Sequence, residues 1–547
     1  YNSLMPTCKN CQNTFEIAKD DLNFYAKLSY GPGLEVPTPT LCPNCRLQRR
    51  LTYRNEPHLY KNICALCKNP TISLHSPESG YKIFCQDCWW SDKWDPHVYA
   101  RDFDFNKKFF EQYAEMQKQI PRIGLMNKAA ENSEFCNYAG YNKNCYLAVG
   151  GSWYSEDCYY GRHFNHCRNC CDCESIKMSE LCYESIWGSN LYNCVHCFGS
   201  YNSGYCYFSV NLRGCNNCIF CSNLRNKTYY IYNKQSTKEE YEKLIKQLLD
   251  PNNFSAAVTN YKRFKSQAIY PPSYQTNCEN CTGDYLENCK NVQHGSNIFD
   301  GEDCKYVVQA EGIKDVMDCS SIGYDHPELY YETINAGTGG FNGKFTFNSW
   351  ECTNVTYGDT VMNSQDCFGC VSMHNKRNCI LNKQYSEEEY KKLRDRIILH
   401  MKNTKEYGEF FPIQLSPFGY NETSAQDYFP LIREQAIKKG YKWHDDSVQE
   451  KSAANVATTS AENLCEECHK PFRLTSHELI FYKKLNIPSP RKCFFCRHRE
   501  RFFTRNLPNL FDRICANCNA KIQTAFSPDR PEKIYCEKCY MQAIIGC

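Results

Sequence analysis

Eight Cys-x-x-Cys pairs lie in the two terminal segments of this 547-residue chain, and they constrain its fold more than any other feature. Two thiolates at this spacing can bind one tetrahedral zinc ion at about 2.3 Å. The chain has 40 cysteines, and pairs in a regular series favour metal binding in a reducing compartment over a secreted disulfide framework. We therefore predict about four structural zinc ions, with the ligands Cys8, Cys11, Cys42, Cys45, Cys64, Cys67, Cys85, Cys88, Cys465, Cys468, Cys493, Cys496, Cys515, Cys518, Cys536 and Cys539.

The two terminal segments are copies of one module. In both, the last two spacers between cysteine pairs are 18 and 17 residues long. A shift of 451 positions also superposes many other residues: Arg46 on Arg497, Arg50 on Arg501, Arg54 on Arg505, Asn55 on Asn506, Pro57 on Pro508, Leu59 on Leu510, Ser76 on Ser527 and Pro77 on Pro528. Eight cysteines per copy suit two four-cysteine sites.

The spacing alone leaves open whether the pairs of one module combine sequentially or crosswise. The first half of each module has a Cys-x-x-Cys-Arg motif at the second pair, prolines before it, and shared aromatic positions between the pairs: Phe15, Leu22–Tyr25, Phe472 and Leu479–Tyr482. In these features it resembles the probable zinc-ribbon domain family, a four-cysteine, treble-clef-like fold of unknown function. The resemblance implies that pairs one and two close one site. The layout of the whole chain also resembles large uncharacterised zinc-ribbon proteins of candidate-phyla bacteria and giant viruses.

An arginine-rich segment follows the second pair of each module. "RLQRRLTYRN" and "RHRERFFTRN" lack glycine and proline and are followed by Pro57 and Pro508, which predicts a short helix in each. Helices that carry arginines can contact phosphate groups. The predicted nucleic-acid contacts are Arg46, Arg49, Arg50, Arg54, Arg497, Arg499, Arg501 and Arg505. The alternative is a helix face whose arginines are solvated or pair with acidic groups elsewhere in the protein.

The middle of the chain has a different periodicity. Cys158, Cys182 and Cys206 are 24 residues apart, and the pairs Cys170/Cys173, Cys194/Cys197 and Cys218/Cys221 recur with the same period. A fixed period with short β-compatible pieces predicts a β-solenoid with coils of about 24 residues. The paired cysteines could bind metal between coils, or form a ladder of small buried side chains in a narrow interior. We favour the ladder.

A shift of 149 positions superposes the end of this region on a second copy, Cys218 on Cys367 and Cys221 on Cys370. Each copy closes with an acidic helix, for which we predict Ser236 and Ser386 as N-caps. Such helices can cover the open end of a solenoid.

The predicted fold class is a mainly β multidomain protein, with two β-solenoid regions and their capping helices between duplicated double zinc modules. We divide the chain as follows: 1–95, double four-cysteine zinc module; 96–132, helical connector; 133–250, first solenoid with capping helix; 251–275, connector; 276–403, second solenoid with capping helix; 404–463, aromatic and proline-rich segment with a flexible linker; 464–547, double four-cysteine zinc module.

The sequence contains no recognisable catalytic motif: no His-Glu-x-x-His, no phosphate-binding Gly-x-x-x-x-Gly-Lys and no Gly-x-Ser-x-Gly. The net charge of +3 confines any nucleic-acid surface to a local patch. With no apolar run long enough for a membrane span, we expect a cytoplasmic protein. The leading hypothesis is a non-enzymatic binder of RNA or of a ribonucleoprotein such as the ribosome. The alternatives are a protein-interaction or structural scaffold built on the solenoid, and an enzyme with an unrecognised site there.

Overall fold

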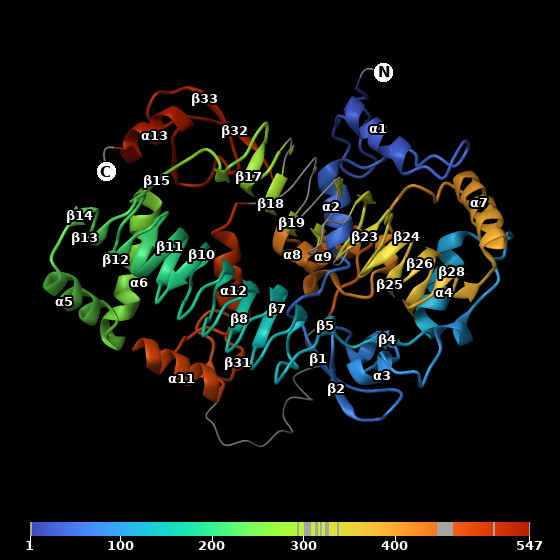
Figure 1. The fold of residues 1–547 in the computed structure, drawn as a ribbon, viewed down its shortest axis with the longest axis horizontal. Helices are drawn as coiled ribbons and strands as arrows, with labels where there is room; N and C mark the ends of the chain where they lie inside the picture. The colour runs from blue at the N-terminus through green and yellow to red at the C-terminus, as the bar shows by residue number, and fades with distance from the viewer. Residues whose placement is uncertain are drawn as a thin grey trace. The chain divides into compact units, whose positions relative to one another are not determined.

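In the computed structural model, the chain forms two compact units that each combine segments from distant parts of the sequence (Figure 1). Unit 1 contains Tyr1–Leu125 and Tyr274–Asp445, and unit 2 contains Met126–Ser273 and Asp446–Cys547. The N-terminal module therefore belongs with the second predicted solenoid region, and the C-terminal module with the first. The structure describes residues 3–290, 292, 295–299, 308–311, 316–317, 320–322, 328–335, 339–445, 463–506 and 509–545, so most of the predicted flexible linker lies outside them.

A ten-stranded sheet, almost entirely parallel, forms the body of unit 2 (Figure 1). Its neighbouring strands pair with an offset of 12 residues over most of the sheet: Ile186 lies opposite Phe198 and Gly204 opposite Asn216. The predicted repeat of about 24 residues is therefore wrong by a factor of two. In one set of buried positions cysteine and serine alternate, with Cys173, Ser185, Cys197 and Ser209 at successive 12-residue steps, so the Cys-x-x-Cys pairs recur only every second step.

The backbone turns at every third residue. From Tyr154 to Tyr232, each third residue has a positive φ, which places it in the left-handed region. Such residues bend the chain sharply, and four of these three-residue steps make up one 12-residue repeat. Over much of this stretch, the residue directly after each left-handed position is buried. One residue in three therefore contributes its side chain to the buried core of the unit.

Cysteine is the commonest of these interior residues. One column contains Cys158, Cys170, Cys182, Cys194, Cys206 and Cys218, all completely buried. The Cys206 thiol donates hydrogen bonds to the carbonyl oxygens of Gly204 (3.2 Å) and Cys215 (3.6 Å). Burial raises the pKa of this thiol well above its ordinary value, so it stays protonated and able to donate. These contacts are those expected of the predicted cysteine ladder.

Unit 1 contains the same arrangement in a second set of parallel strands. Thr353 pairs with Gln365 and Gln365 with Arg377, again 12 residues apart. Every third residue from Asn342 to Leu381 has a positive φ. In each unit the parallel series ends with a short antiparallel strand, β14 after β13 and β29 after β28.

An acidic helix follows each of these terminal strands. Ser386 is the N-cap of one helix, as predicted, because its side chain accepts the N–H of Glu389. The other prediction is wrong by one residue: Thr237, not Ser236, accepts the N–H of Glu240. Ser236 instead contacts the Glu240 side chain.

The elements of unit 1 are α1 (Lys19–Lys27), α2 (Pro43–Leu51), β1 (Tyr60–Ile63), β2 (Pro70–Ser73), β3 (Ile83–Phe84), α3 (Gln86–Trp89), α4 (Phe109–Gln119), β4 (Arg122–Ile123), β16 (Gln275–Thr276), β17 (Gly283–Glu287), β18 (Gly295–Phe299), β19 (Val308–Glu311), β20 (Val316–Met317), β21 (Ser320–Ile322), β22 (Tyr330–Tyr331), β23 (Gly340–Phe341), β24 (Cys352–Thr356), β25 (Asp359–Met362), β26 (Gln365–Phe368), β27 (Val371–His374), β28 (Arg377–Ile380), β29 (Lys383–Gln384), α7 (Glu387–Asn403), α8 (Ser424–Tyr428) and α9 (Arg433–Lys438).

Those of unit 2 are β5 (Asn127–Lys128), β6 (Asn137–Gly140), β7 (Tyr146–Trp153), β8 (Tyr159–Asn165), β9 (Glu174–Lys177), β10 (Ile186–Tyr192), β11 (Val195–Val210), β12 (Asn216–Ile219), β13 (Thr228–Ile231), β14 (Lys234–Gln235), α5 (Lys238–Leu248), α6 (Pro251–Gln267), β15 (Ile269–Tyr270), β30 (Asn463–Leu464), β31 (Pro471–Phe472), α11 (Ser476–Leu485), α12 (Phe494–Phe503), β32 (Phe511–Ile514), β33 (Lys521–Thr524), β34 (Lys533–Ile534) and α13 (Glu537–Ile545). Among the described residues of both units, each helix is too short or too polar to span a membrane.

We expect the column of buried cysteines that contains Cys206 to accept serine but to have little room for a larger side chain. Ser185 makes the same pair of contacts as Cys206, since its hydroxyl donates to the carbonyl oxygens of Tyr183 and Cys194. We expect Cys206→Ser to lower the free energy of unfolding by less than about 1 kcal/mol, and Cys206→Leu to lower it by about 1–3 kcal/mol through overpacking. Thermal unfolding of the two variants tests this, and equal losses would contradict the narrow interior.

Candidate metal centres

Four groups of four cysteines converge in the terminal modules. Within each group, the four sulfur atoms all lie within 4.8 Å of one another. The groups are Cys8, Cys11, Cys42 and Cys45; Cys64, Cys67, Cys85 and Cys88; Cys465, Cys468, Cys493 and Cys496; and Cys515, Cys518, Cys536 and Cys539. Every group joins two successive Cys-x-x-Cys pairs, so sequential pairing is confirmed and the crossed alternative is wrong.

The first pair of every site lies in the same tight turn. The residue after its second cysteine has a positive φ, as at Gln12 (64°) and His469 (56°). The N–H of this residue donates to the carbonyl oxygen of the first cysteine, at 3.0 Å from Gln12 to Cys8. Lys68 and Asn519 repeat both features at the other two sites. The turn brings both thiols of the pair to one side of the backbone.

The second pair of every site lies at the beginning of a helix. Cys42, Cys85 and Cys493 are the N-caps of α2, α3 and α12, and α13 begins one residue after Cys536. Free N–H groups and the helix dipole stabilise thiolates at this position. The backbone N–H of each of these four residues donates to the first cysteine of its own site, at 3.2 Å from Cys42 to Cys8, 3.4 Å from Cys85 to Cys64, 3.3 Å from Cys493 to Cys465 and 3.1 Å from Cys536 to Cys515.

The geometry of the sulfur atoms fits a tetrahedral metal ion. Sulfur atoms at 2.3 Å from a central ion are about 3.8 Å apart in a tetrahedron. The distance between the second and third sulfur atoms is 3.7 Å in the Cys11–Cys42, Cys468–Cys493 and Cys518–Cys536 pairs and 3.9 Å in the Cys67–Cys85 pair. Each group could therefore hold one ion, and a donor set of four thiolates suits zinc.

Hydrogen bonds to the first cysteine favour the thiolate form that a metal needs. Burial raises the pKa of the Cys64 thiol, but the N–H groups of Cys85, Cys67 and Leu66 lower it overall to about 6. Backbone N–H groups likewise lower the pKa of Cys465 and of Cys515 to about 6.

The arginines of α2 converge on one acidic residue in unit 1. Glu332 pairs with Arg46 (3.1 Å), Arg49 (2.8 Å) and Arg50 (3.0 Å). We call these four residues the Glu332 cluster. All four are buried, and Arg49 also pairs with Glu409 at 2.7 Å. Glu332 has a positive φ and so occupies one of the left-handed positions of unit 1.

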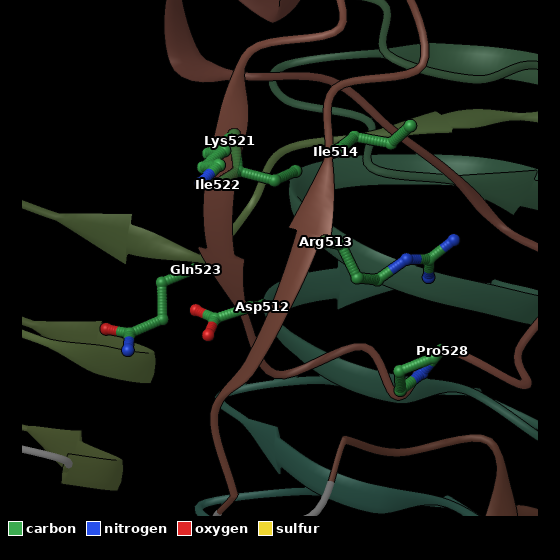
Figure 2. Close-up of a pocket in the computed structure, with 7 residues that line it drawn as sticks. All are labelled: Asp512, Arg513, Ile514, Lys521, Ile522, Gln523 and Pro528. Carbon is green, nitrogen blue, oxygen red and sulfur yellow. The ribbon is translucent and has the colours of Figure 1, made fainter.

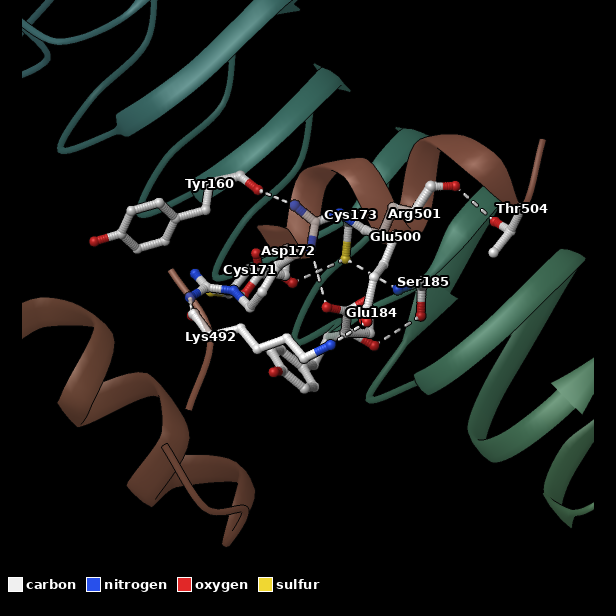
Figure 3. Close-up of polar contacts among 12 residues, drawn as sticks. Tyr160, Cys171, Asp172, Cys173, Glu184, Ser185, Lys492, Glu500, Arg501 and Thr504 are labelled. Carbon is white, nitrogen blue, oxygen red and sulfur yellow. Dashed lines mark hydrogen bonds and ion pairs between the residues drawn. The ribbon is translucent and has the colours of Figure 1, made fainter. Parts of the chain in front are cut away.

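The arginines of α12 make the corresponding contacts in unit 2 (Figure 3). Asp172 pairs with Arg497 (2.9 Å) and Arg501 (2.8 Å), and Arg501 also pairs with Glu184 (3.0 Å). We call these four residues the Asp172 cluster. Arg501 additionally donates to the backbone carbonyl of Tyr160 at 3.2 Å (Figure 3). Asp172 and Glu184 both have a positive φ and lie 12 residues apart, in one column of left-handed positions.

Electrostatic interactions inside the Asp172 cluster keep Arg501 charged. Burial alone disfavours the charged guanidinium, but Asp172 and Glu184 raise the pKa of Arg501 above its ordinary value. Burial and the proximity of Asp172 raise the pKa of Glu184 to about 7, against the opposing effect of Arg501. Arg505 lies in a second ion pair of the same unit, with Glu174. Burial would raise the pKa of Glu174, but Arg505 and Arg162 lower it to about 2.

The two clusters are equivalent in the duplicated modules. Arg46 and Arg50 superpose on Arg497 and Arg501, and each pair binds one carboxylate of a parallel sheet. Arg46 and Arg497 also donate to equivalent backbone carbonyls, those of Leu41 (2.8 Å) and Lys492 (2.6 Å). Position 49 differs, because the C-terminal copy has Glu500 there.

The structure therefore places most of the predicted nucleic-acid contacts inside the protein. Arg54 is buried beside Glu56, which makes seven of the eight arginines buried in ion pairs: Arg46, Arg49, Arg50, Arg54, Arg497, Arg501 and Arg505. Arg499 is the exception, since its exposed side chain pairs with Glu467. In this structure the seven are not positioned to contact a phosphate backbone. Sequence reasoning left open that the arginines pair with acidic groups elsewhere but did not identify Glu332, Asp172, Glu184 or Glu174, because each is a single acidic residue in a repeat region.

Comparison with known proteins provides no assignment, because no family model and no curated protein sequence matches the chain.

The four-cysteine groups predict a definite metal stoichiometry. We expect the purified chain to carry about four zinc ions, and Cys493→Ser to carry about three because it removes one ligand of one site. Elemental analysis measures both. Cys206→Ser is the matched control, since Cys206 is buried outside the four groups. A zinc content that is unchanged in Cys493→Ser, or equally reduced in the control, would contradict the assignment.

Proposed function

We propose that this chain is a non-enzymatic zinc-binding scaffold for protein interactions. In this proposal the parallel sheet of each unit closes into a β-solenoid, with four three-residue sides to each 12-residue coil. The zinc modules staple the ends of the chain onto these solenoids, and the outer solenoid and module surfaces bind partners. The proposal takes up the alternative that the sequence left open, a scaffold built on the solenoid.

The observation that carries the proposal is the burial of the arginine helices. An arginine that binds phosphate must reach solvent, yet Arg50 is fully buried and both Arg497 and Arg501 are nearly so. Each belongs to the Glu332 or the Asp172 cluster, where it already pairs with a buried carboxylate. This arrangement favours an internal role for the helices and weighs against RNA binding through them.

Zinc has a specific role in this proposal. Cys42 and Cys45 flank the first turn of α2, and Cys493 and Cys496 flank that of α12, so a bound ion fixes the beginning of each arginine helix. Arg46 and Arg497 follow directly after the last ligands. The metal would thus orient the side chains that pair with Glu332 and Asp172. Structural zinc of this kind contributes its binding energy to folding.

The scaffold and RNA-binding hypotheses predict different salt dependence. A scaffold whose arginines are buried should show no saturable binding of a fluorescently labelled single-stranded RNA at low salt, and it should purify free of nucleic acid. RNA binding through four arginines would give saturable binding, with a slope of about −3 in log K against log salt. Fluorescence anisotropy across a salt series measures this slope, and a slope near that value would contradict the scaffold proposal.

A further inference from the structure

Helix α12 of the C-terminal module has an exposed stripe that contains two phenylalanines. Phe495, Arg499 and Phe503 are spaced four residues apart and therefore lie on one face of the helix. Phe495 is 44% exposed and Phe503 is 58% exposed. Large apolar side chains on a single helix face mark an interaction site more often than scattered ones do.

The N-terminal module covers the equivalent face of its own helix α2. A shift of 451 positions superposes Gln48 on Arg499 and Thr52 on Phe503. Gln48 and Thr52 are buried, at 8% and 2% exposure. Only the first position of the stripe is exposed in both copies, as Asn44 on α2 and as Phe495 on α12. The duplicated module thus shows this face in two states: it is covered on α2 and, among the described residues, exposed on α12.

Residues 412–428, "PIQLSPFGYNETSAQDY", cover the face of α2. The side chain of Gln48 donates to the hydroxyl of Tyr420 at 2.8 Å. The hydroxyl of Ser416 donates to the carbonyl of Thr52 at 2.6 Å, so both buried positions of the face are contacted. This 412–428 segment is rich in proline and aromatic residues, and it ends in the short helix α8.

The same segment continues over the strand hairpin of the N-terminal module. The hydroxyl of Tyr60 on β1 donates to Glu422. The ring of Phe418 stacks on His75 with ring centres 5.3 Å apart. The surface that the 412–428 segment covers therefore extends from the helix to the hairpin.

The corresponding hairpin of the C-terminal module borders an open pocket of about 650 Å³ (Figure 2). It lies on β32 and β33 and is lined by Asp512, Arg513, Ile514, Lys521, Ile522, Gln523 and Pro528. Ile514 is 62% exposed. The helix stripe and this pocket belong to the same module, as do the two covered surfaces of the N-terminal copy.

One contact of the 412–428 segment is replaced in the C-terminal module by a residue of the module itself. In the N-terminal copy the carbonyl of Arg54 accepts the N–H of Ser424. In the C-terminal copy the equivalent carbonyl, that of Arg505, accepts a hydrogen bond from the guanidinium of Arg530. Arg530 also packs on Phe526, the counterpart of His75. Arg530 therefore occupies this end of the surface, and the stripe and the pocket remain open.

We propose that the Phe495–Arg499–Phe503 stripe and the β32–β33 pocket form a docking surface for a proline- and aromatic-rich acidic segment of a partner protein, with the chemistry of residues 412–428. The proposal rests on the scaffold role proposed above and names its partner class. The chain's own 412–428 segment is already bound to α2 in unit 1. Charge also favours such a partner: the 412–428 segment has two acidic and no basic residues, whereas Arg499, Arg513 and Lys521 outnumber Asp512 and Glu467, the partner of Arg499.

A synthetic peptide of residues 409–431 is a direct probe of this surface. We expect the fluorescently labelled peptide to bind the full chain saturably, as measured by fluorescence anisotropy. Phe503→Ser and Phe495→Ser should each weaken binding by about tenfold or more, because each removes a large apolar contact. Ile480→Ser is the matched control: Ile480 is 65% exposed on α11 of the same module, and its replacement should leave peptide affinity unchanged.

Each alternative outcome contradicts the proposal in a recognisable way. No saturable binding by a chain that keeps its zinc and its thermal stability would overturn the docking surface and leave the scaffold role intact. Equal affinity in Phe503→Ser and in the unmodified chain would place the peptide elsewhere and also overturn it. A concentration-dependent dimer that is lost in Phe503→Ser, seen by sedimentation, would identify a second copy of the chain as the occupant in place of a partner.

Discussion

Arg501 and Asp172 face one another in an interior from which water is excluded, and neither charge can be buried there alone without a large cost in desolvation. The docking of α12 on the parallel sheet of unit 2 depends on this pairing. Unit 1 contains the same interaction between Arg50 and Glu332. Buried ion pairs contribute little net stability compared with apolar packing, but they are intolerant of misplacement. These ion pairs therefore specify the position at which a small module docks, and they add little to its stability.

The four-cysteine sites and the ion pairs meet at one short helix in each module. A module of this size has too small an apolar core to hold its helix rigidly, so a metal ion bound by its cysteines would supply that rigidity. The cysteines at the beginning of α12 precede Arg497 directly, and Arg501 lies one turn later. The carboxylates that pair with these arginines, those of Asp172 and Glu332, belong to left-handed positions, which recur every three residues. The helix thus contacts a regular column of positions, and only one or two members of that column are acidic.

The sequence predicted what depends on local spacing. The four-cysteine groups, the duplicated module, the arginine helices and the Ser386 cap all follow from residues close together in the chain. The 12-residue step was visible in Cys158, Cys170, Cys182, Cys194, Cys206 and Cys218. It was missed because the Cys-x-x-Cys pairs recur only every 24 residues, since Ser185 and Ser209 replace the second cysteine of the pair in alternate repeats. The partners of the arginines could not be predicted, since Asp172 is 329 positions from Arg501 and Glu332 is 282 positions from Arg50. No local pattern distinguishes these carboxylates from the solvated ones around them.

A double-mutant cycle on Arg501 and Asp172 tests the central claim most directly, with the exposed Arg499–Glu467 pair as the reference. If the buried pair fixes the module, Arg501→Gln and Asp172→Asn should each lower the free energy of unfolding of the zinc-loaded chain by about 3–5 kcal/mol. The double variant should lose far less than the sum, because it restores the charge balance of the cluster, in which Arg497 and Glu184 remain. Arg499→Gln and Glu467→Gln should each cost about 1 kcal/mol or less. Additive losses of that smaller size at Arg501 and Asp172 would contradict the account.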